Sequence, residues 1–266
     1  MPKRIMPAEE WGWRITEQEL ESWILERLDN VLVLNKPAGV VCHPSKHGSW
    51  SSLAGAAREY LGTSKLHMPF RLDRETSGVM LLTGCEVAGK RLQRAVQQGQ
   101  YRKEYTALMA GQLRDRTVVG LPLAGSPDSL VRIKRRVVRD GSGQAALTIF
   151  VPLKSTVNGT LARVLPATGR LHQIRVHASA IGHALIGDKV YGPDESLFVE
   201  FIEKGWTQRQ QQMLGLRRQA LHCSVVDFTS NEITGKRRFT APFARDLYQF
   251  CEEELGFRPP DYLDFA

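Results

Sequence analysis

The chain has 266 residues, a formal net charge of +8 and a sequence pI of about 9.5. Hydrophobic residues make up 42% and charged residues 24%, which excludes a largely disordered chain and allows one large domain or two small ones. The positive charge favours an anionic partner such as nucleic acid, although a basic surface that only aids solubility is compatible with it too.

The sequence carries no pattern for a membrane span, a secretory signal or a cysteine-based metal site. No apolar run approaches the ~20 residues that cross a bilayer, and acidic residues follow Lys3 and Arg4 where a secretory signal would be apolar. The four cysteines form no C-x-x-C pair, so free thiols in a reducing compartment are expected. We therefore expect a cytoplasmic protein without membrane contact.

Hydrophobic periodicity predicts the elements of the N-terminal half. Thr16 and Glu19 have the spacing of a capping box, and apolar residues follow at helical spacing as far as Leu28. This predicts a short helix within an N-terminal extension, residues 1–28. The remaining elements expected here are strands at 31–34, 40–41, 79–82 and 103–109, and helices at 51–61 and 86–98.

The C-terminal half is richer in predicted strands. They are expected at 131–138, 145–151, 161–165 and 221–228, with helices at 171–181 and 243–255. Arg132, Lys134 and Arg136 would lie on one face of the first of these strands. Residues 192–216 are expected to form a surface insertion. Because strands outnumber helices and do not alternate strictly with them, the pattern favours an α+β fold with a mixed or largely antiparallel sheet.

The run Arg71-Leu72-Asp73-Arg74-Glu75-Thr76-Ser77-Gly78 ends where a strand is predicted to begin. Arginines on both sides of Asp73 would lower its pKa, and an ionised carboxylate can act as a nucleophile or a general base. An aspartate between arginines is more often part of a surface ion-pair cluster, so this run alone does not decide between the two interpretations.

A second run, residues 168–177, contains Arg170, His172, Ile174 and Arg175. On a helix, Arg175 and His172 would share a face that points away from the core, and a planar guanidinium there suits a carboxylate or a phosphate. The glycine before Arg170 would let the helix N-terminus approach an anion. Ordinary solvated polar residues are the alternative.

Two further patterns permit RNA contact, each with an ordinary structural alternative. Tyr105 in the run Lys103-Glu104-Tyr105 could stack on a base or could be a core tyrosine. Arg132, Lys134 and Arg136 could follow an RNA backbone or form a solvated face.

No metal and no cofactor are expected. His172, His177 and His183 are spaced five and six residues apart, which does not place them on one helical face. The phosphate-binding patterns G-x-x-x-x-G-K-[ST] and G-x-G-x-x-G are both absent from the sequence.

Taken in order, four of these motifs resemble the RluA-type group of pseudouridine synthases, over about residues 28–255. They are an opening strand with a Lys-Pro loop (35–44), the R-L-D-x-x-T-S-G run (71–78), the tyrosine motif (103–105) and the third motif (168–177, continued at 182–192). The chain departs from the pattern at Phe70, where the family often has His. We also expect no S4-type RNA-binding domain before the first strand.

The resemblance implies the pseudouridine synthase fold: α+β, with a central mixed, mostly antiparallel sheet, flanking helices and an RNA-binding cleft. The catalytic domain would span residues 29–258 and a tail residues 259–266. The activity implied is isomerisation of a uridine in tRNA or rRNA by a monomer, with base flipping and without a cofactor or metal. A non-catalytic RNA-binding protein or RNA chaperone on the same fold, and a metal hydrolase built on the histidines, are the alternatives.

The resemblance also implies roles for individual residues. Asp73 would be the catalytic carboxylate, Arg175 would pair with it, and Tyr105 would stack on the flipped base. Arg71 would enter the RNA stack in place of that base, and Ile174 would also contact the substrate. The residues expected to contact RNA more widely are Arg132, Lys134, Arg136, Arg170 and His172.

Overall fold

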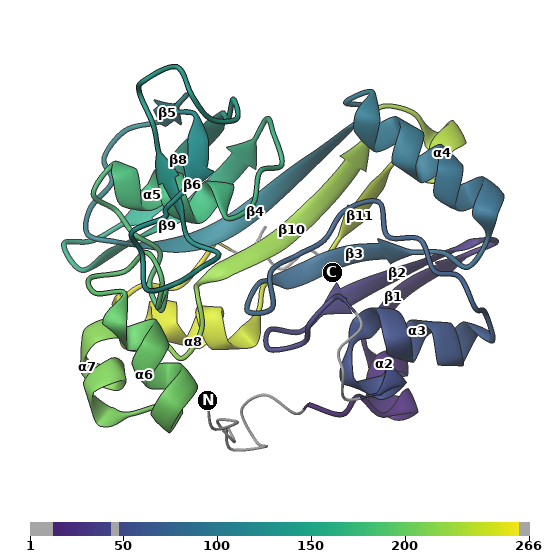
Figure 1. Ribbon diagram of the computed structural model, residues 1–266, viewed down its shortest axis with the longest axis horizontal. Helices are drawn as coiled ribbons and strands as arrows, with labels where there is room; N and C mark the ends of the chain where they lie inside the picture. The colour runs from purple at the N-terminus through teal and green to yellow at the C-terminus, as the bar shows by residue number, and fades with distance from the viewer. Residues whose placement is uncertain (1–12, 44–47, 261–266) are drawn as a thin grey trace. The chain divides into compact units, whose positions relative to one another are not determined.

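The computed structural model describes residues 13–43 and 48–260, which divide into two compact units. We call residues 13–43, 48–103 and 223–242 the Asp73 unit, and residues 104–222 and 243–260 the Arg175 unit (Figure 1). Strands β4 (Tyr101–Ala110) and β10 (Leu221–Phe228) each begin in one unit and end in the other.

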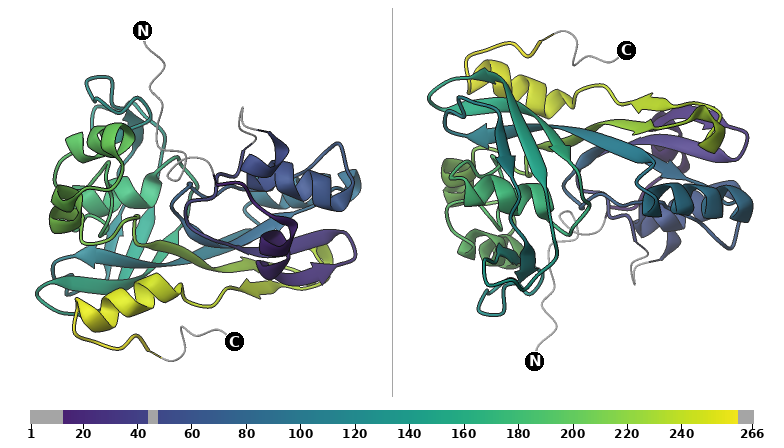
Figure 2. Two further views of the ribbon diagram at one scale, coloured as in Figure 1. Left: turned by 90° about the horizontal axis from the view of Figure 1, so that it is seen from below. Right: turned by 90° about the horizontal axis from the view of Figure 1, so that it is seen from above.

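Antiparallel pairs β1–β2, β2–β3 and β10–β11 form the sheet of the Asp73 unit, in the order β1-β2-β3-β10-β4 with β11 also on β10. All six residues of β3 are buried, and Figure 2 shows α3 and α4 on one face of these strands. The bounds are α2 (Glu17–Ser22), β1 (Ile24–Leu28), β2 (Val31–Lys36), η1 (Ser49–Ser51), α3 (Leu53–Leu61), β3 (Ser77–Leu82), α4 (Glu86–Gln97), η2 (Asn231–Ile233) and β11 (Arg238–Thr240).

The N-terminal helix starts as predicted but is shorter. Thr16 and Glu19 form the expected capping box, yet the helix ends at Ser22 and Ile24–Leu28 is a strand paired with β2. The prediction of helix up to Leu28 was therefore wrong, because backbone pairing across the turn at residues 29–30 outweighs the helical spacing of the apolar residues. The predicted strand at 40–41 is a loop. Residues 1–12 of the predicted N-terminal extension lie outside the described residues.

In the Arg175 unit the strand order is β10-β4-β9-β8-β5, and the pairs β4–β9, β8–β9 and β5–β8 are antiparallel. A separate hairpin joins β6 to β7. Figure 2 shows α8 on one face of the main strands and α5, α6 and α7 on the other. The bounds are β5 (Thr117–Val119), β6 (Leu123–Gly125), β7 (Arg135–Val137), β8 (Thr148–Ser155), β9 (Gly159–Pro166), α5 (Gln173–Ala180), α6 (Ser196–Lys204), α7 (Gln208–Leu214) and α8 (Arg245–Glu253).

Three predictions for this unit needed correction. The strand expected at 131–138 covers only Arg135–Val137, because residues 131–134 form a turn in which Lys134 N donates to Val131 O at 2.8 Å. Helix α5 begins at Gln173, two residues late, because His172 has the left-handed φ of +58°. Residues 192–216 include two helices with buried side chains, α6 and α7, so they are more than a surface insertion.

The predicted α+β fold with a mixed, mostly antiparallel sheet and flanking helices is confirmed. The RNA-binding cleft and the boundaries at residues 28 and 258 stay predictions. Within the part of the chain that the structure describes, no helix has the length and apolarity that a bilayer span requires.

Candidate active site

The Lys-Pro loop holds the backbone next to Asp73. Lys36 is fully buried, and its Nζ donates to the carbonyl oxygens of Pro37 at 2.8 Å, Val40 at 2.9 Å and Arg74 at 3.1 Å. Gly39 N donates to Arg74 O at 2.8 Å, while Arg74 Nε donates to Gly39 O at 2.9 Å. A buried ammonium must be matched by acceptors, so these bonds fix the two loops to each other.

The chain turns sharply between Asp73 and β3. Thr76 N donates to Asp73 O at 3.1 Å, which closes the turn. Gly78 has φ +113°, and a Cβ atom there would lie 2.2 Å from the carbonyl oxygen of Cys223 on β10. Only glycine allows this backbone conformation together with this close approach. The final glycine of the R-L-D-x-x-T-S-G run therefore lets β3 begin immediately after the loop.

Phe70 and Tyr101 place a second cation beside the Asp73 loop. The Phe70 and Tyr101 rings stack with centroids 5.8 Å apart, and Lys103 Nζ lies 4.9 Å from the Phe70 centroid, within cation–π range. Burial lowers the pKa of Lys103, and electrostatic interactions with Cys223 and Asp73 partly oppose that shift. Phe70, the departure from the family pattern, thus packs the loop against β4.

Arg71 is exposed, and its guanidinium contacts the ring nitrogen Nε2 of His43. Burial lowers the pKa of His43, and the charge of Arg71 lowers it further. A neutral imidazole can accept from the guanidinium, so Arg71 lies at the surface of the Asp73 unit with a partner that positions it.

Arg175 is the centre of a buried hydrogen-bond network in the Arg175 unit. Its Nε donates to Asp188 Oδ2 at 2.7 Å and its Nη2 to Asp188 Oδ1 at 2.9 Å, while Val190 N and Tyr191 N also donate to Oδ1. Burial alone raises the pKa of Asp188, but the Arg175 charge and these hydrogen bonds together bring it below its usual value. Arg175 is buried, so the prediction that it points away from the core was wrong.

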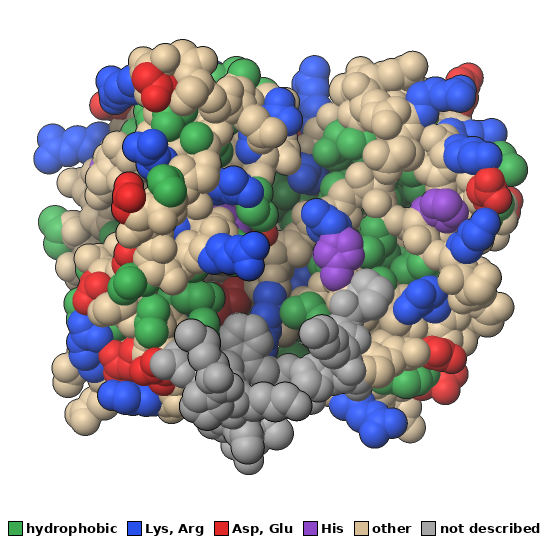
Figure 3. All heavy atoms as spheres, in the orientation of Figure 1, with side chains coloured by type: hydrophobic (Ala, Val, Ile, Leu, Met, Phe, Trp, Pro, Cys, Tyr) green, Lys and Arg blue, Asp and Glu red, His purple; other side chains and the backbone are tan. Residues whose placement is uncertain are grey.

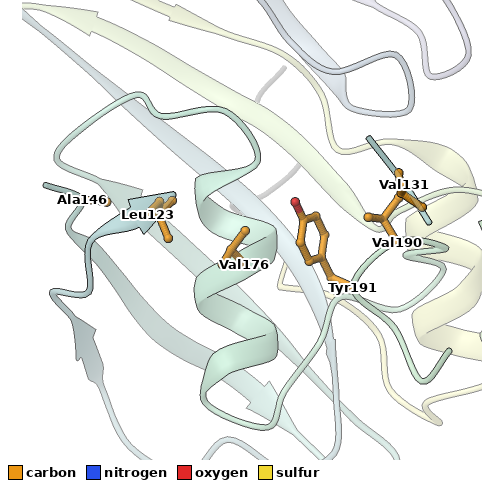
Figure 4. Packing of buried hydrophobic residues seen from close by; sticks show 6 residues of the cluster. All are labelled: Leu123, Val131, Ala146, Val176, Val190 and Tyr191. Atoms are coloured by element: carbon orange, nitrogen blue, oxygen red, sulfur yellow. The ribbon is translucent and has the colours of Figure 1, made fainter. Parts of the chain in front are cut away.

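Tyr191 links Arg175 to the start of α5. The Arg175 guanidinium carbon lies 5.0 Å from the Tyr191 ring centroid, and Figure 4 shows that ring beside α5, near Val176. The Tyr191 hydroxyl accepts from Arg135 N at 2.8 Å and lies 2.8 Å from His172 Nδ1. Among the described residues, His172 is the one non-glycine residue with a positive φ. Its hydrogen bond to Tyr191 helps to stabilise this unfavourable backbone conformation.

Gln173 fixes the turn that contains Arg170. Its Oε1 accepts from Thr168 Oγ1 at 2.6 Å and Arg170 N at 3.1 Å, and its Nε2 donates to Leu147 O and Thr148 Oγ1 at 2.9 and 3.0 Å. One buried amide thus uses both its oxygen and its nitrogen, and it joins this turn to the residues at the start of β8.

Tyr105 and Ile174, the other predicted substrate residues, also belong to the Arg175 unit. Tyr105 is buried in β4 opposite Val164 of β9, and Ile174 is buried in the first turn of α5. In sequence, Tyr105 follows Lys103 by two residues, so β4 carries both the cation next to Phe70 and this tyrosine.

The predicted RNA-contacting residues differ in exposure. Arg132, Arg136 and Arg170 are exposed, whereas His172 is buried and Lys134 forms a 2.8 Å ion pair with Glu195. The three histidines have separate partners: His172 contacts Tyr191, His177 contacts Thr148 and Leu121, and His183 contacts Ala110. Over residues 13–43 and 48–260, no three metal-binding side chains come together.

Sequence reasoning missed four residues that hold the surroundings of Asp73 in one unit and of Arg175 in the other: Lys36, Gln173, Asp188 and Tyr191. Each lies inside a motif run that had been recognised, which was the available signal. Several of their partners are 13, 38 or 56 residues away along the chain, and local spacing does not reveal such pairings.

Two solved structures identify the class of fold. Human RNA Pseudouridylate Synthase Domain Containing 4 matches with a TM-score of 0.67 and 24% identity, covering 88% of this chain and 94% of that one. Human RNA Pseudouridylate Synthase Domain Containing 1 matches with a TM-score of 0.62 and 20% identity, covering 90% and 96%. The chain therefore has the pseudouridylate synthase fold.

Sequence comparison then gives the family. The model of the RNA pseudouridylate synthase family matches residues 30–180, more than half of the chain. Ribosomal large subunit pseudouridine synthase D of Zymomonas mobilis is 30% identical, over 86% of this chain and 72% of that protein. RNA pseudouridine synthase YjbO of Bacillus subtilis is 31% identical, over 93% and 82%, and ribosomal large subunit pseudouridine synthase C of Escherichia coli is 32% identical, over 87% and 69%.

This chain belongs to the RNA pseudouridylate synthase family, within its RluA-type group, as the motifs predicted. It is an isomerase that converts uridine in RNA to pseudouridine.

Proposed function

We propose that Asp73 is the catalytic carboxylate and that the substrate is large-subunit ribosomal RNA. The observation that carries the assignment of Asp73 is the loop around it. Buried Lys36 binds the backbone carbonyl of the next residue, Arg74, and Lys103 lies near enough for its charge to interact with that of Asp73. A carboxylate on a fixed loop beside a cation suits catalysis better than a mobile surface ion pair does.

The reaction explains why a fixed, charged carboxylate is useful. The bond from C1′ to N1 breaks, a bond from C1′ to C5 forms, the proton on C5 leaves, and N1 gains one. An ionised carboxylate can act as the nucleophile or as the base that removes the C5 proton. Nearby positive charge keeps such a carboxylate ionised in a site from which water is excluded.

We propose that residues of the Arg175 unit bind the substrate. In this proposal Asp188 orients the guanidinium of Arg175, and Tyr105 and Ile174 receive the flipped base. Flipping costs a few kcal/mol, and exposed Arg71 would offset part of that cost by taking the place of the base in the RNA stack.

The choice of ribosomal RNA rests on the relatives. Proteins 30% and 32% identical are named ribosomal large subunit pseudouridine synthases D and C. Arg132, Arg136 and Arg170 are exposed and available for phosphate contacts, and Figure 3 shows Lys and Arg side chains spread over one face of each unit. We further propose that the protein acts in the cytoplasm as a monomer.

Pseudouridine mapping tests this proposal. Large-subunit rRNA and tRNA would be sequenced from a strain that lacks the gene and from the same strain carrying the wild-type or the Asp73→Asn allele. At least one rRNA pseudouridine should disappear in the deletion and return only with the wild-type allele. A site that is lost in tRNA alone contradicts the choice of RNA, and a site restored by Asp73→Asn contradicts the role of Asp73.

A further inference from the structure

The loop between β6 and β7, residues 126–134, exposes two large aliphatic side chains. Leu130 is 71% exposed and Ile133 52%, whereas Val131 between them is buried in the core cluster with Leu123 and Val176 (Figure 4). Val131 therefore fixes the loop to the core of the unit, while Leu130 and Ile133 remain exposed to water.

Glu195 makes this loop rigid. Its carboxylate accepts from Ser129 Oγ at 2.6 Å, Leu130 N at 3.3 Å and Lys134 Nζ at 2.8 Å. Ser126 N donates to Lys134 O at 3.1 Å, which closes the base of the loop. Leu130 and Ile133 are thus displayed by a structure that resists their collapse onto the protein, although burial would be favourable for both.

The charge around Leu130 and Ile133 indicates which partner fits. Arg132 lies between the two aliphatic residues, and Arg136 and Arg139 follow along the hairpin, all three exposed. Asp128 is the acid of the loop, and Lys134 is neutralised by Glu195. This excess of exposed cations beside two aliphatic side chains suits RNA, because RNA contacts combine cations for phosphates with apolar surfaces for bases.

We propose that the β6–β7 loop is an RNA-binding wedge, in which Leu130 and Ile133 pack against unstacked bases and Arg132 binds a neighbouring phosphate. Aliphatic wedges that enter a base step unstack it and hold the strand in a bent form. The loop would then favour RNA that can open at the contacted step. This inference rests on the proposed function only in that the ligand is RNA.

Equilibrium binding to a transcript of large-subunit rRNA, measured over a series of salt concentrations, tests the wedge. Leu130→Ser/Ile133→Ser should weaken binding roughly tenfold or more, with an unchanged salt slope, because no phosphate contact is lost. Arg132→Gln should lower the slope by about one. The matched control is Val118→Ser/Val157→Ser, which alters two exposed aliphatic residues of the same unit and should bind as wild type does.

Wild-type affinity of Leu130→Ser/Ile133→Ser overturns the inference, provided that urea unfolding shows the variant folded. Unchanged RNA affinity together with loss of a wild-type dimer in sedimentation would show a protein interface instead and would also overturn it. If the wedge variant binds weakly while a strain carrying Asp73→Asn keeps its pseudouridines, the wedge stands and the proposed role of Asp73 fails.

Discussion

Replacing Asp188 with Asn removes one charge from a fully buried ion pair. Asp188 Oδ1 accepts from Arg175 Nη2, Val190 N and Tyr191 N, and Oδ2 accepts from Arg175 Nε at 2.7 Å. An Asn oxygen at the Oδ1 position can keep the first three bonds. The amide nitrogen would then face Arg175 Nε, donor against donor, and the guanidinium would remain buried without a countercharge from residue 188.

Breaking a buried pair in this way costs about 3–5 kcal/mol. Three of the four bonds at Asp188 can persist, so we expect the lower end, ~3 kcal/mol, which is a large part of the ~5–15 kcal/mol that stabilises a typical domain. The melting temperature should fall by roughly 10 °C. Activity should fall too, even where the variant is folded, because the direction of the Arg175 guanidinium depends on Asp188.

Urea unfolding and pseudouridine formation, measured on the same preparation, provide the assay. Asp194→Asn is the control, because Asp194 pairs with Arg209 at 2.8 Å on the surface and such pairs contribute at most ~1 kcal/mol. If Asp188→Asn is as stable as Asp194→Asn and fully active, the argument that the buried pair orients Arg175 is refuted.

The same pair predicts a pH dependence with a definite sign. The folded-state pKa of Asp188 is depressed, so its stabilising contribution is present above the unfolded value of about 3.9 and is lost as pH falls through the lower folded value. The difference in the free energy of unfolding between the wild type and Asp188→Asn should therefore be constant near neutral pH and decrease below about pH 4. A difference that grows on acidification contradicts the assignment.

Two predictions concern the Asp73 loop. Lys36→Met removes three hydrogen bonds to loop carbonyls. Because the loop then loses its fixed geometry, kcat should fall roughly tenfold or more with a smaller change in KM. Steady-state kinetics test this prediction, and an unchanged kcat would reject it. Gly78→Ala would place Cβ 2.2 Å from Cys223 O and should cost roughly 2–4 kcal/mol in urea unfolding. The control Gly62→Ala, with φ +60° and open space, should cost only about 1–2 kcal/mol.

The sequence predicted the features that depend on periodic or local patterns of residues. Strand and helix periodicity located most elements, and the Thr16–Glu19 capping box marked the start of α2 correctly. The order of the motifs was enough for the family. Periodicity gave the wrong prediction at Ile24–Leu28. Apolar residues at a helical spacing can also occur in a strand, and here that strand pairs with β2 across a tight turn.

What the sequence could not predict are the partners of buried polar groups. Arg175 looked like a surface cation because its helix neighbours are polar, and only the fold brings Asp188 to it from 13 residues away. In the same way Lys36 reads as part of a loop motif, but its contact with Arg74 O spans 38 residues. Such pairings depend on tertiary packing, which local spacing does not encode.

Release of tritium from 5-labelled uridine in large-subunit rRNA, catalysed by the purified protein, tests the central claim most directly. The wild type should release tritium, and so should the control Asp227→Asn, which alters a carboxylate of the same unit that pairs with Arg237 at 3.0 Å. Asp73→Asn should release none while unfolding at the same urea concentration as the control. Tritium release by Asp73→Asn at the wild-type rate would contradict the assignment of Asp73 as the catalytic carboxylate.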